Sequence, residues 1–329
     1  MDNKIILGTT LYSFTNEWVQ RAYTLEQLVE KVAQLKLGKA VEIVGFQSIR
    51  SFPDVTDEFA AHFRALLQKH DLMPSCLGAN YDIGRHRDRL MTNDEAITYL
   101  ERQIVSAQKL GFPVLRIQAF IDPQGFEKIA PIAEKAKVHV ACELHSPLSV
   151  DHPEVIKLRK CFDRVASPYI GFIPDFSCTM TTPPHSFWEN LRVMNASEEL
   201  IEGAKQVWLS NKPNPEKYTE LAALGQQFNA NETILGQLNT SMTMFGHMEV
   251  EKWAEILPYA RHIHGKFYEV DDSAREPSIP YPEIMTLLKK AGFAGTISAE
   301  WEGHAFTPKP IGIQQVQAWH NMCNNLLAN

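Results

Sequence analysis

The stretch TLEQLVEKVAQLKLGKAVEIVGF (24–46) contains one complete unit of the expected fold, a helix followed by a strand. Thr24, with Gln27 three residues on, is typical of a helix N-terminus, and the residues after it are apolar at helical spacing. Gly38 comes just after the helix, where a left-handed cap is needed, and an apolar run of strand length follows it. The stretch therefore predicts a helix over 24–37 and a strand over 40–46.

The same alternation continues along the chain. Apolar runs predict eight strands, at 5–11, 40–46, 72–79, 114–120, 138–144, 169–176, 262–270 and 296–301. Helical segments are predicted between them, at 24–37, 56–70, 93–110, 125–136, 153–166 and 281–291. Thr56 and Asn93 mark helix starts, and Gly111 and Gly292 mark helix ends. Eight βα units of this regularity predict a single (β/α)8 TIM barrel over 1–329, with a doubly wound sheet as the alternative.

One long excursion, residues 178–260, separates the sixth and seventh predicted strands. It contains two predicted helices, over 197–208 and 215–229. Connections of this length usually form a lid, a subunit contact or an added subdomain. Because the excursion leaves from the end of a strand, we expect it to overhang the functional site.

Composition restricts the function classes. The net charge is −7, and no Lys and Arg cluster compensates for it, so nucleic acid is not an expected partner. The five cysteines are an odd number without CxxC spacing, which indicates a reducing compartment. The N-terminus has no signal-like stretch, and no run approaches the ~20 apolar residues of a membrane span. We therefore expect a cytoplasmic protein that does not enter membranes.

Four predicted strands end in a residue that can bind a divalent cation: Glu143, Asp175, His264 and Glu300. Since the carboxyl ends of parallel barrel strands meet on one face, these four residues are expected to share a centre. Three carboxylates and one imidazole suit a single divalent ion, with Mn²⁺ in first place and Mg²⁺, Zn²⁺ or Co²⁺ as alternatives.

Each candidate ligand also has a structural interpretation, which for Glu143, in a run expected to be buried, is a salt bridge. Asp175 could cap the turn that follows it. His262 lies two residues before His264 and on the same face of the strand, so either histidine could be the ligand. Glu300 could form a salt bridge with Lys266. These alternatives remain open at the level of sequence.

The same strand ends supply candidates for acid and base chemistry. His145 lies two residues after Glu143 and should share its face, so it is the first candidate for general base or acid, with a supporting hydrogen bond as the alternative role. Glu143 and Glu300 are further candidates. Lys266 could hold a developing oxyanion or neutralise a carboxylate. A divalent cation beside such groups favours removal of a proton next to a carbonyl.

Two further groups of residues are candidates for substrate contacts. Arg116 and Gln118 share one face of a predicted strand and could contact a polar substrate. Aromatic residues near strand ends could stack on a sugar ring, with core packing as the alternative; these are Phe14, Tyr81, Phe120, Trp188 and Trp301. No GxGxxG, P-loop, GxSxG or HExxH motif occurs, which argues against dinucleotide binding, nucleotide hydrolysis, a nucleophile elbow and zincin chemistry.

The motifs CELHSP, PDFS, HIHGKF and SAEWEG resemble those of the xylose isomerase-like TIM barrels, over nearly the whole chain. The resemblance implies one divalent metal on Glu143, Asp175, His264 and Glu300, and a sugar isomerase or epimerase type of activity. Two positions depart from the family pattern. Cys178 stands where a histidine often follows the aspartate, and Phe267 stands where the seventh strand usually has an acid.

A narrower resemblance, through CELHSP, the chain length and the long excursion, is to the α subunits of C-glycoside deglycosidases. It implies a sugar or glycoside substrate, cleavage of a C-glycosidic bond in a keto-glycoside with His145 as base, and an oligomer with a small second subunit. Two other classes stay open: a metal-dependent hydrolase on the same barrel, and a non-catalytic metal-binding subunit of a complex.

Overall fold

Eight parallel strands form the centre of the computed structural model, which describes residues 5–81, 83–118 and 121–328. The strands are β1 (Ile6–Thr10), β2 (Ala40–Val44), β3 (Met73–Ala79), β4 (Val114–Ile117), β5 (His139–Leu144), β6 (Ile170–Pro174), β7 (His262–Phe267) and β8 (Thr296–Trp301). Their hydrogen-bonded order is β6-β5-β4-β3-β2-β1-β8-β7, and every neighbouring pair is parallel. The TIM barrel is confirmed, and the doubly wound alternative is wrong.

The barrel closes where β6 meets β7. Two isolated parallel bridges join this seam, Phe172 with Ala260 and Asp175 with His264. Gly171 makes the approach possible, because a Cβ at this position would lie 2.0 Å from the carbonyl oxygen of Tyr259. The seam therefore depends on close backbone contact, and it places Asp175 beside His264.

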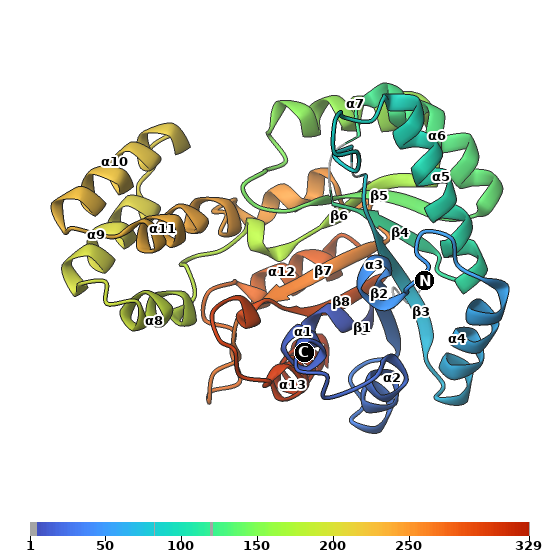
Figure 1. The fold of residues 1–329 in the computed structure, drawn as a ribbon, viewed down its shortest axis with the longest axis horizontal. Helices are drawn as coiled ribbons and strands as arrows, with labels where there is room; N and C mark the ends of the chain where they lie inside the picture. Colours follow the sequence, from blue (N-terminus) through green and yellow to red (C-terminus); the bar gives the residue numbers. More distant parts are fainter. Residues whose placement is uncertain (1–4, 82, 119–120, 329) are drawn as a thin grey trace.

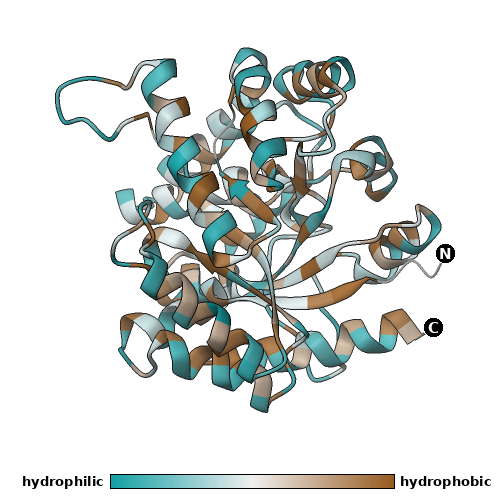
Figure 2. Ribbon diagram, turned by 90° about the vertical axis from the view of Figure 1, so that its right-hand side faces the viewer, coloured by the Kyte–Doolittle hydropathy of each residue, from teal (hydrophilic) through white to brown (hydrophobic). Residues whose placement is uncertain are grey.

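Helices surround the strands on the outside of the barrel (Figure 1). They are α2 (Leu25–Gln34), α4 (Asp57–Lys69), α5 (Asn93–Leu110), α6 (Pro123–Ala136), α7 (Pro153–Val165), α12 (Tyr281–Lys290) and α13 (Gly312–Ala328), with the short helices α1 (Thr15–Val19) and α3 (Gly45–Ser48) and the 3-10 segments η1 (Leu11–Phe14) and η5 (Gly303–Ala305). Figure 2 shows hydrophilic and hydrophobic residues alternating along these helices, as expected for helices that pack one face on a sheet.

Most predicted helix ends are observed. Thr24 forms a capping box with Gln27, and the glycines at the predicted ends have positive φ, 85° for Gly38, 85° for Gly111 and 68° for Gly292. The predicted cap at the start of α5 was wrong by one residue. Thr92, not Asn93, accepts the amide of Glu95, and the Glu95 carboxylate accepts the amide of Thr92 in return, so this pair satisfies two amides at once.

Several strands are shorter than predicted because apolar residues continue past the sheet. The run 40–46 leaves the sheet after Val44, where α3 begins. The run 169–176 leaves it after Pro174, and the run 262–270 leaves it after Phe267. The last two residues of the predicted strand 114–120 lie outside the described residues. Burial alone does not distinguish a strand end from a buried loop.

The chain between β6 and β7 is largely helical. Its elements are η2 (Phe176–Cys178), α8 (His185–Val193), α9 (Glu198–Leu209), α10 (Asn214–Gln227), α11 (Glu232–Met244), η3 (Val250–Glu255) and η4 (Leu257–Tyr259). The helices predicted over 197–208 and 215–229 correspond to α9 and α10, whereas α8 and α11 were not predicted. Figure 1 shows these helices gathered to one side of the barrel. Their buried side chains belong to the same apolar cluster as the barrel core, which favours a single domain. The single domain over 1–329 stays a prediction, and so does the role of this segment as a lid or subunit contact.

Other sequence features can be compared with the described residues. The five cysteines are buried, and no disulfide joins them. No helix in the described ranges is both long and apolar enough to cross a membrane.

Glu276, in the connection between β7 and α12, is expected to make stability depend on pH. Its Oε2 accepts the amides of Ser278 (2.7 Å) and Ile279 (2.5 Å), and its Oε1 is buried and has no hydrogen-bond partner in the described part of the chain. Burial raises the pKa of Glu276 from 4.5 to about 8, although the two amides act in the opposite direction. The pKa of Glu276 is higher in the folded than in the unfolded protein. The contribution of the neutral Glu276 carboxyl group to stability is therefore complete below about pH 4.5 and is lost as the pH rises to about 8.

The measurement is thermal unfolding of wild type and Glu276→Gln between pH 5 and pH 9. Glutamine cannot ionise, so the variant should gain stability relative to wild type as the pH rises, by a few kcal/mol at most, since one pKa unit corresponds to about 1.4 kcal/mol. A difference between the two proteins that is constant over this range would show that Glu276 does not titrate as the structure indicates.

Candidate metal centre

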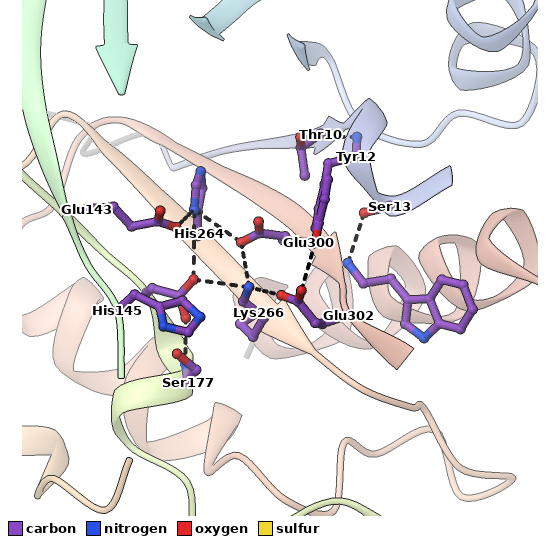
Figure 3. Close-up of polar contacts among 12 residues, drawn as sticks. Thr10, Tyr12, Ser13, Glu143, His145, Ser177, His264, Lys266, Glu300 and Glu302 are labelled. Atoms are coloured by element: carbon purple, nitrogen blue, oxygen red, sulfur yellow. Dashed lines mark hydrogen bonds and ion pairs between the residues drawn. The ribbon is translucent and has the colours of Figure 1, made fainter. Parts of the chain in front are cut away.

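Three carboxylates converge on one ring nitrogen of His264 at the carboxyl end of the barrel (Figure 3). Nδ1 of His264 lies 2.5 Å from Oε1 of Glu143, 3.1 Å from Oε2 of Glu300 and 3.8 Å from Oδ2 of Asp175. One donor atom from each of the four residues lies within 4.8 Å of the others, and all four residues are buried. The structure therefore brings together the four residues that the sequence indicated as metal ligands.

Two oxygens of this cluster, Oδ2 of Asp175 and Oε2 of Glu300, are buried and make no hydrogen bond among the described residues. Both lie at ion-pair distance from Nζ of Lys266, 3.4 Å and 3.3 Å. A buried charged oxygen without a hydrogen bond is costly, and these oxygens face a histidine nitrogen. Three carboxylates and one imidazole with such oxygens fit a divalent cation.

Asp175 caps a turn and also belongs to the cluster of candidate ligands. Its Oδ1 accepts the amide of Ser177 at 2.7 Å and caps η2, whereas its Oδ2 faces His264 and Lys266. The capping role and the candidate ligand role therefore use different oxygens, and one does not exclude the other.

Lys266 links the cluster to a carboxylate that was not predicted. The predicted pair with Glu300 is present, but the closest partner of Nζ is Oε2 of Glu302, whose Oε1 accepts the Tyr12 hydroxyl at 2.9 Å (Figure 3). Glu302 lies two residues after Glu300, so the alternation used for His145 could have indicated it. We found no sequence signal for Tyr12.

Electrostatic pKa shifts differ among the carboxylates. Burial raises the pKa of Asp175 from 3.8 to about 6, although Lys266 opposes this shift. Burial also acts to raise the pKa of Glu300, but His264 and Lys266 outweigh it and lower this pKa to about 2. Asp175 is therefore the carboxyl group of the cluster that takes up a proton most readily in mildly acidic solution.

His264 and Glu143 polarise each other. Burial acts to lower the pKa of His264, but Glu300, Glu42 and Glu143 raise it well above its usual value. Burial acts to raise the pKa of Glu143, but Arg116 and His264 lower it well below its usual value. In the absence of a cation, Nδ1 of His264 therefore carries a proton toward Glu143, and a cation bound there would take the place of that proton.

Arg116 supports Glu143 from inside the barrel. It is 6% exposed, and its Nη1 donates to Oε2 of Glu143 at 3.3 Å. Gly78 on β3 leaves room for it, because a Cβ there would lie 2.9 Å from Nη2 of Arg116. Arg116 therefore takes part in the charge balance of Glu143, and its contact with a substrate stays a prediction. Gln118 is exposed and does not share this environment.

His145 follows the last residue of β5 and is half-buried. Its Nδ1 lies 2.6 Å from the carbonyl oxygen of Ser146, and because a carbonyl can only accept, Nδ1 is the protonated nitrogen. Nε2 is then left with a lone pair that can accept a proton. His145 lies beside the cluster (Figure 3).

His262, the alternative candidate to His264 as metal ligand, points toward Glu42 on β2. Nε2 of His262 lies 2.9 Å from Oε2 of Glu42, and Nε2 of His264 lies 3.0 Å from Oε1 of Glu42. Burial acts to raise the pKa of Glu42, but the two histidines lower it, so this carboxyl group is ionised. Glu42 was not among the residues indicated by the sequence.

The predicted aromatic wall corresponds mostly to core packing. Tyr81 is partly buried against the main apolar cluster, whereas Phe120 lies outside the described residues. The other three aromatic residues are fully buried in that cluster: Phe14, Trp188 and Trp301.

Comparisons with known proteins show the family of this chain. A family model described as xylose isomerase-like TIM barrel matches residues 35–322. The chain therefore belongs to the xylose isomerase-like TIM barrel family, as the sequence motifs predicted.

The chain is also similar to α subunits of C-glycoside deglycosidases. It is 35% identical over 329 residues to the 3′-dehydrocarminate deglycosidase alpha subunit of a Microbacterium species, covering 97% of this chain and 94% of the relative. It is 37% identical over 317 residues to a C-glycoside deglycosidase alpha subunit of Arthrobacter globiformis, covering 91% and 84%. The D-psicose 3-epimerase of Clostridium cellulolyticum H10, solved with D-tagatose, shares the fold at 13% identity with a TM-score of 0.56, covering 98% and 99%.

Proposed function

We propose that Glu143, Asp175, His264 and Glu300 hold one divalent metal ion, with Mn²⁺ in first place, and that the site removes a proton next to a carbonyl of a sugar or keto-glycoside. The observation that carries this proposal is the convergence of three buried carboxylates on Nδ1 of His264, with two of their oxygens making no hydrogen bond among the described residues. A divalent cation there would stabilise negative charge that develops on a substrate oxygen.

His145 is the proposed base. Its Nε2 is free to accept a proton, whereas the carboxylates of Glu143 and Glu300, the other candidates, have pKa values below the usual range and are weaker bases. Lys266 forms ion pairs with Asp175 and Glu300, which favours their ionised, ligating form.

The names of the relatives favour cleavage of a C-glycosidic bond as the reaction. His145 would take the proton from the carbon next to a ring carbonyl. A carbon–carbon double bond would form in the sugar as the bond to the aglycone breaks. The electron pair would leave on the aglycone carbon, which then gains a proton, so no oxidant or reductant is consumed. An epimerase or isomerase would instead return the proton to the sugar.

The same names include the words alpha subunit, and on this basis we propose a second, smaller subunit as partner. The segment from α8 to α11 is the proposed contact or lid. It leaves the barrel directly after Asp175 and η2, at the end where the proposed ligands meet.

The test uses the Mn²⁺-loaded protein, alone and with its partner subunit, incubated in D₂O with a 3-keto C-glycoside and with ketohexoses. We expect aglycone release from the C-glycoside. Deuterium exchange into a ketohexose without aglycone release would favour an epimerase or isomerase. Neither release nor exchange, with metal bound and partner present, would contradict proton abstraction and favour a hydrolase or a non-catalytic subunit.

His145→Ala is expected to lower the rate of aglycone release by ~10²-fold or more, because a positioned general base contributes that much. Metal content should stay near that of wild type, since His145 is not among the proposed ligands. His70→Ala, at the end of α4, provides a control with the same change outside the cluster. Unchanged turnover in His145→Ala would leave this residue with a supporting role only.

Metal affinity is expected to fall as the pH falls. Without metal, His264 has a pKa well above its usual value and Asp175 has a pKa of about 6. Both groups must lose their protons to bind a cation, so the apparent Kd should rise as the pH falls, and more steeply below about pH 6, where Asp175 also takes up a proton. Calorimetric Mn²⁺ titrations in two buffers with different ionisation enthalpies should show proton release of about one per ion or more at pH 6. Binding without proton release would mean that His264 is not a ligand.

A further inference from the structure

Glu42 connects both histidines of β7 across the barrel interior. It lies on β2, which is separated from β7 by β1 and β8 in the sheet order, and it is 1% exposed. Each of its oxygens serves a different ring, Oε1 for His264 and Oε2 for His262. The buried Glu42 carboxylate contacts two buried histidine rings across the barrel. It takes no part in the proposed proton transfer itself.

We propose that Glu42 is a positioning residue that fixes the tautomer and the ring orientation of His264, and this inference rests on the proposed metal site. An ionised carboxylate can only accept, so Nε2 of His264 must carry the hydrogen that it donates to Oε1 of Glu42 at 3.0 Å. The lone pair of the metal-binding form is then at Nδ1, which is the nitrogen that faces Glu143, Glu300 and Asp175. Partners of this kind orient metal ligands and raise their basicity.

His262 holds Glu42 in this orientation. Its Nε2 donates to Oε2 of Glu42 at 2.9 Å, so the carboxylate is fixed at both oxygens and its plane cannot rotate away from His264. The other nitrogen of His262, Nδ1, is buried without a hydrogen bond among the described residues. Of the two histidines, His264 therefore binds the ion, and His262 supports His264 through Glu42.

A second metal ion between Glu42, His262 and His264 is the competing arrangement, because one donor atom from each lies within 4.8 Å of the others. The observed nitrogen–oxygen distances of 2.9 Å and 3.0 Å are ordinary hydrogen bonds, and each oxygen is already used by one ring. Binding a second ion there would also require Nε2 of His264 to lose its hydrogen while Nδ1 binds the first ion.

The test compares Mn²⁺ titrations of wild type, Glu42→Gln and Glu42→Asp. We expect Mn²⁺ affinity to fall by roughly 10–100-fold in Glu42→Gln, because the amide can accept from only one ring and presents a donor to the other. Glu42→Asp keeps the charge but is one methylene shorter, so it should lose affinity by roughly 10-fold or more. Glu17→Gln changes another buried carboxylate, which accepts the amide of Ile313, and should bind Mn²⁺ as wild type does.

A second readout separates positioning from a general loss of structure. In protein loaded with diamagnetic Zn²⁺, nitrogen NMR of the histidine side chains should show His264 bound through Nδ1 and protonated at Nε2 in wild type and Glu17→Gln, whereas in Glu42→Gln part of the His264 rings should bind through Nε2 or stay unbound. Wild-type affinity in Glu42→Gln, full affinity in Glu42→Asp, or two Mn²⁺ ions per chain with one lost in Glu42→Gln would overturn the inference. Failure of wild type to bind any Mn²⁺ would instead overturn the proposed metal site.

Discussion

Asp175→Asn is expected to lose most of its divalent metal while it keeps its fold. Asparagine can still accept the amide of Ser177 through its side-chain oxygen and cap η2, as Oδ1 of Asp175 does. It cannot supply the negative charge of Oδ2, the oxygen that forms ion pairs with His264 and Lys266. We expect metal affinity and turnover to fall by ~10²-fold or more, since loss of an outer partner of a ligand alone costs 10–100-fold.

The measurement is elemental analysis after Mn²⁺ loading and desalting, together with a melting curve of the metal-free protein. Asp122→Asn is the matched control, because Asp122 also caps a helix by accepting an amide, that of Gly125, and lies outside the cluster. Asp175→Ala should lose metal and also the cap, with a further loss of stability of ~1 kcal/mol. Full metal content in Asp175→Asn would remove Asp175 from the proposed ligand set.

Gly171→Ala is expected to destabilise the barrel at the seam between β6 and β7. The added Cβ would lie 2.0 Å from the carbonyl oxygen of Tyr259 and 2.8 Å from Nε2 of His139. The first contact is with backbone, so the strands must move apart where Phe172 bridges Ala260. Forcing extra volume into a packed core typically costs 1–3 kcal/mol, and we expect a loss of about 3 kcal/mol or more here.

Chemical denaturation of the two proteins measures this loss. Gly236→Ala gives the same change in α11, where a Cβ meets nothing within 4 Å, and it should be neutral or stabilise by up to ~1 kcal/mol, as expected for alanine in a helix. Equal stability of Gly171→Ala and wild type would mean that the seam is not closed by the close contact seen in the structure.

The barrel and its cluster could be predicted because both follow from periodic features. Apolar runs alternating with capped helices indicate βα units, and the carboxyl ends of parallel strands must meet, so Glu143, Asp175, His264 and Glu300 could be placed together without knowledge of contacts. The same alternation would have indicated Glu302, which lies two residues after Glu300.

Other features depend on contacts between distant segments and leave no local pattern. Glu42 lies within the apolar run of β2, and its partners His262 and His264 are more than two hundred residues away. The helices α8 and α11 were also missed. α8 starts after Pro184 without a side-chain cap, and α11 contains threonines and a glycine that favour helix only weakly, so tertiary packing decides their structure.

One divalent ion is expected to bind between Glu143, Asp175, His264 and Glu300. Anomalous diffraction from crystals loaded with Mn²⁺ locates the ion without reference to activity. We expect one peak per chain, roughly 2.0–2.5 Å from Nδ1 of His264 and from an oxygen of each carboxylate. No peak at this position after loading, or a peak held by Glu42 and His262 instead, would show that these four residues do not form the metal site.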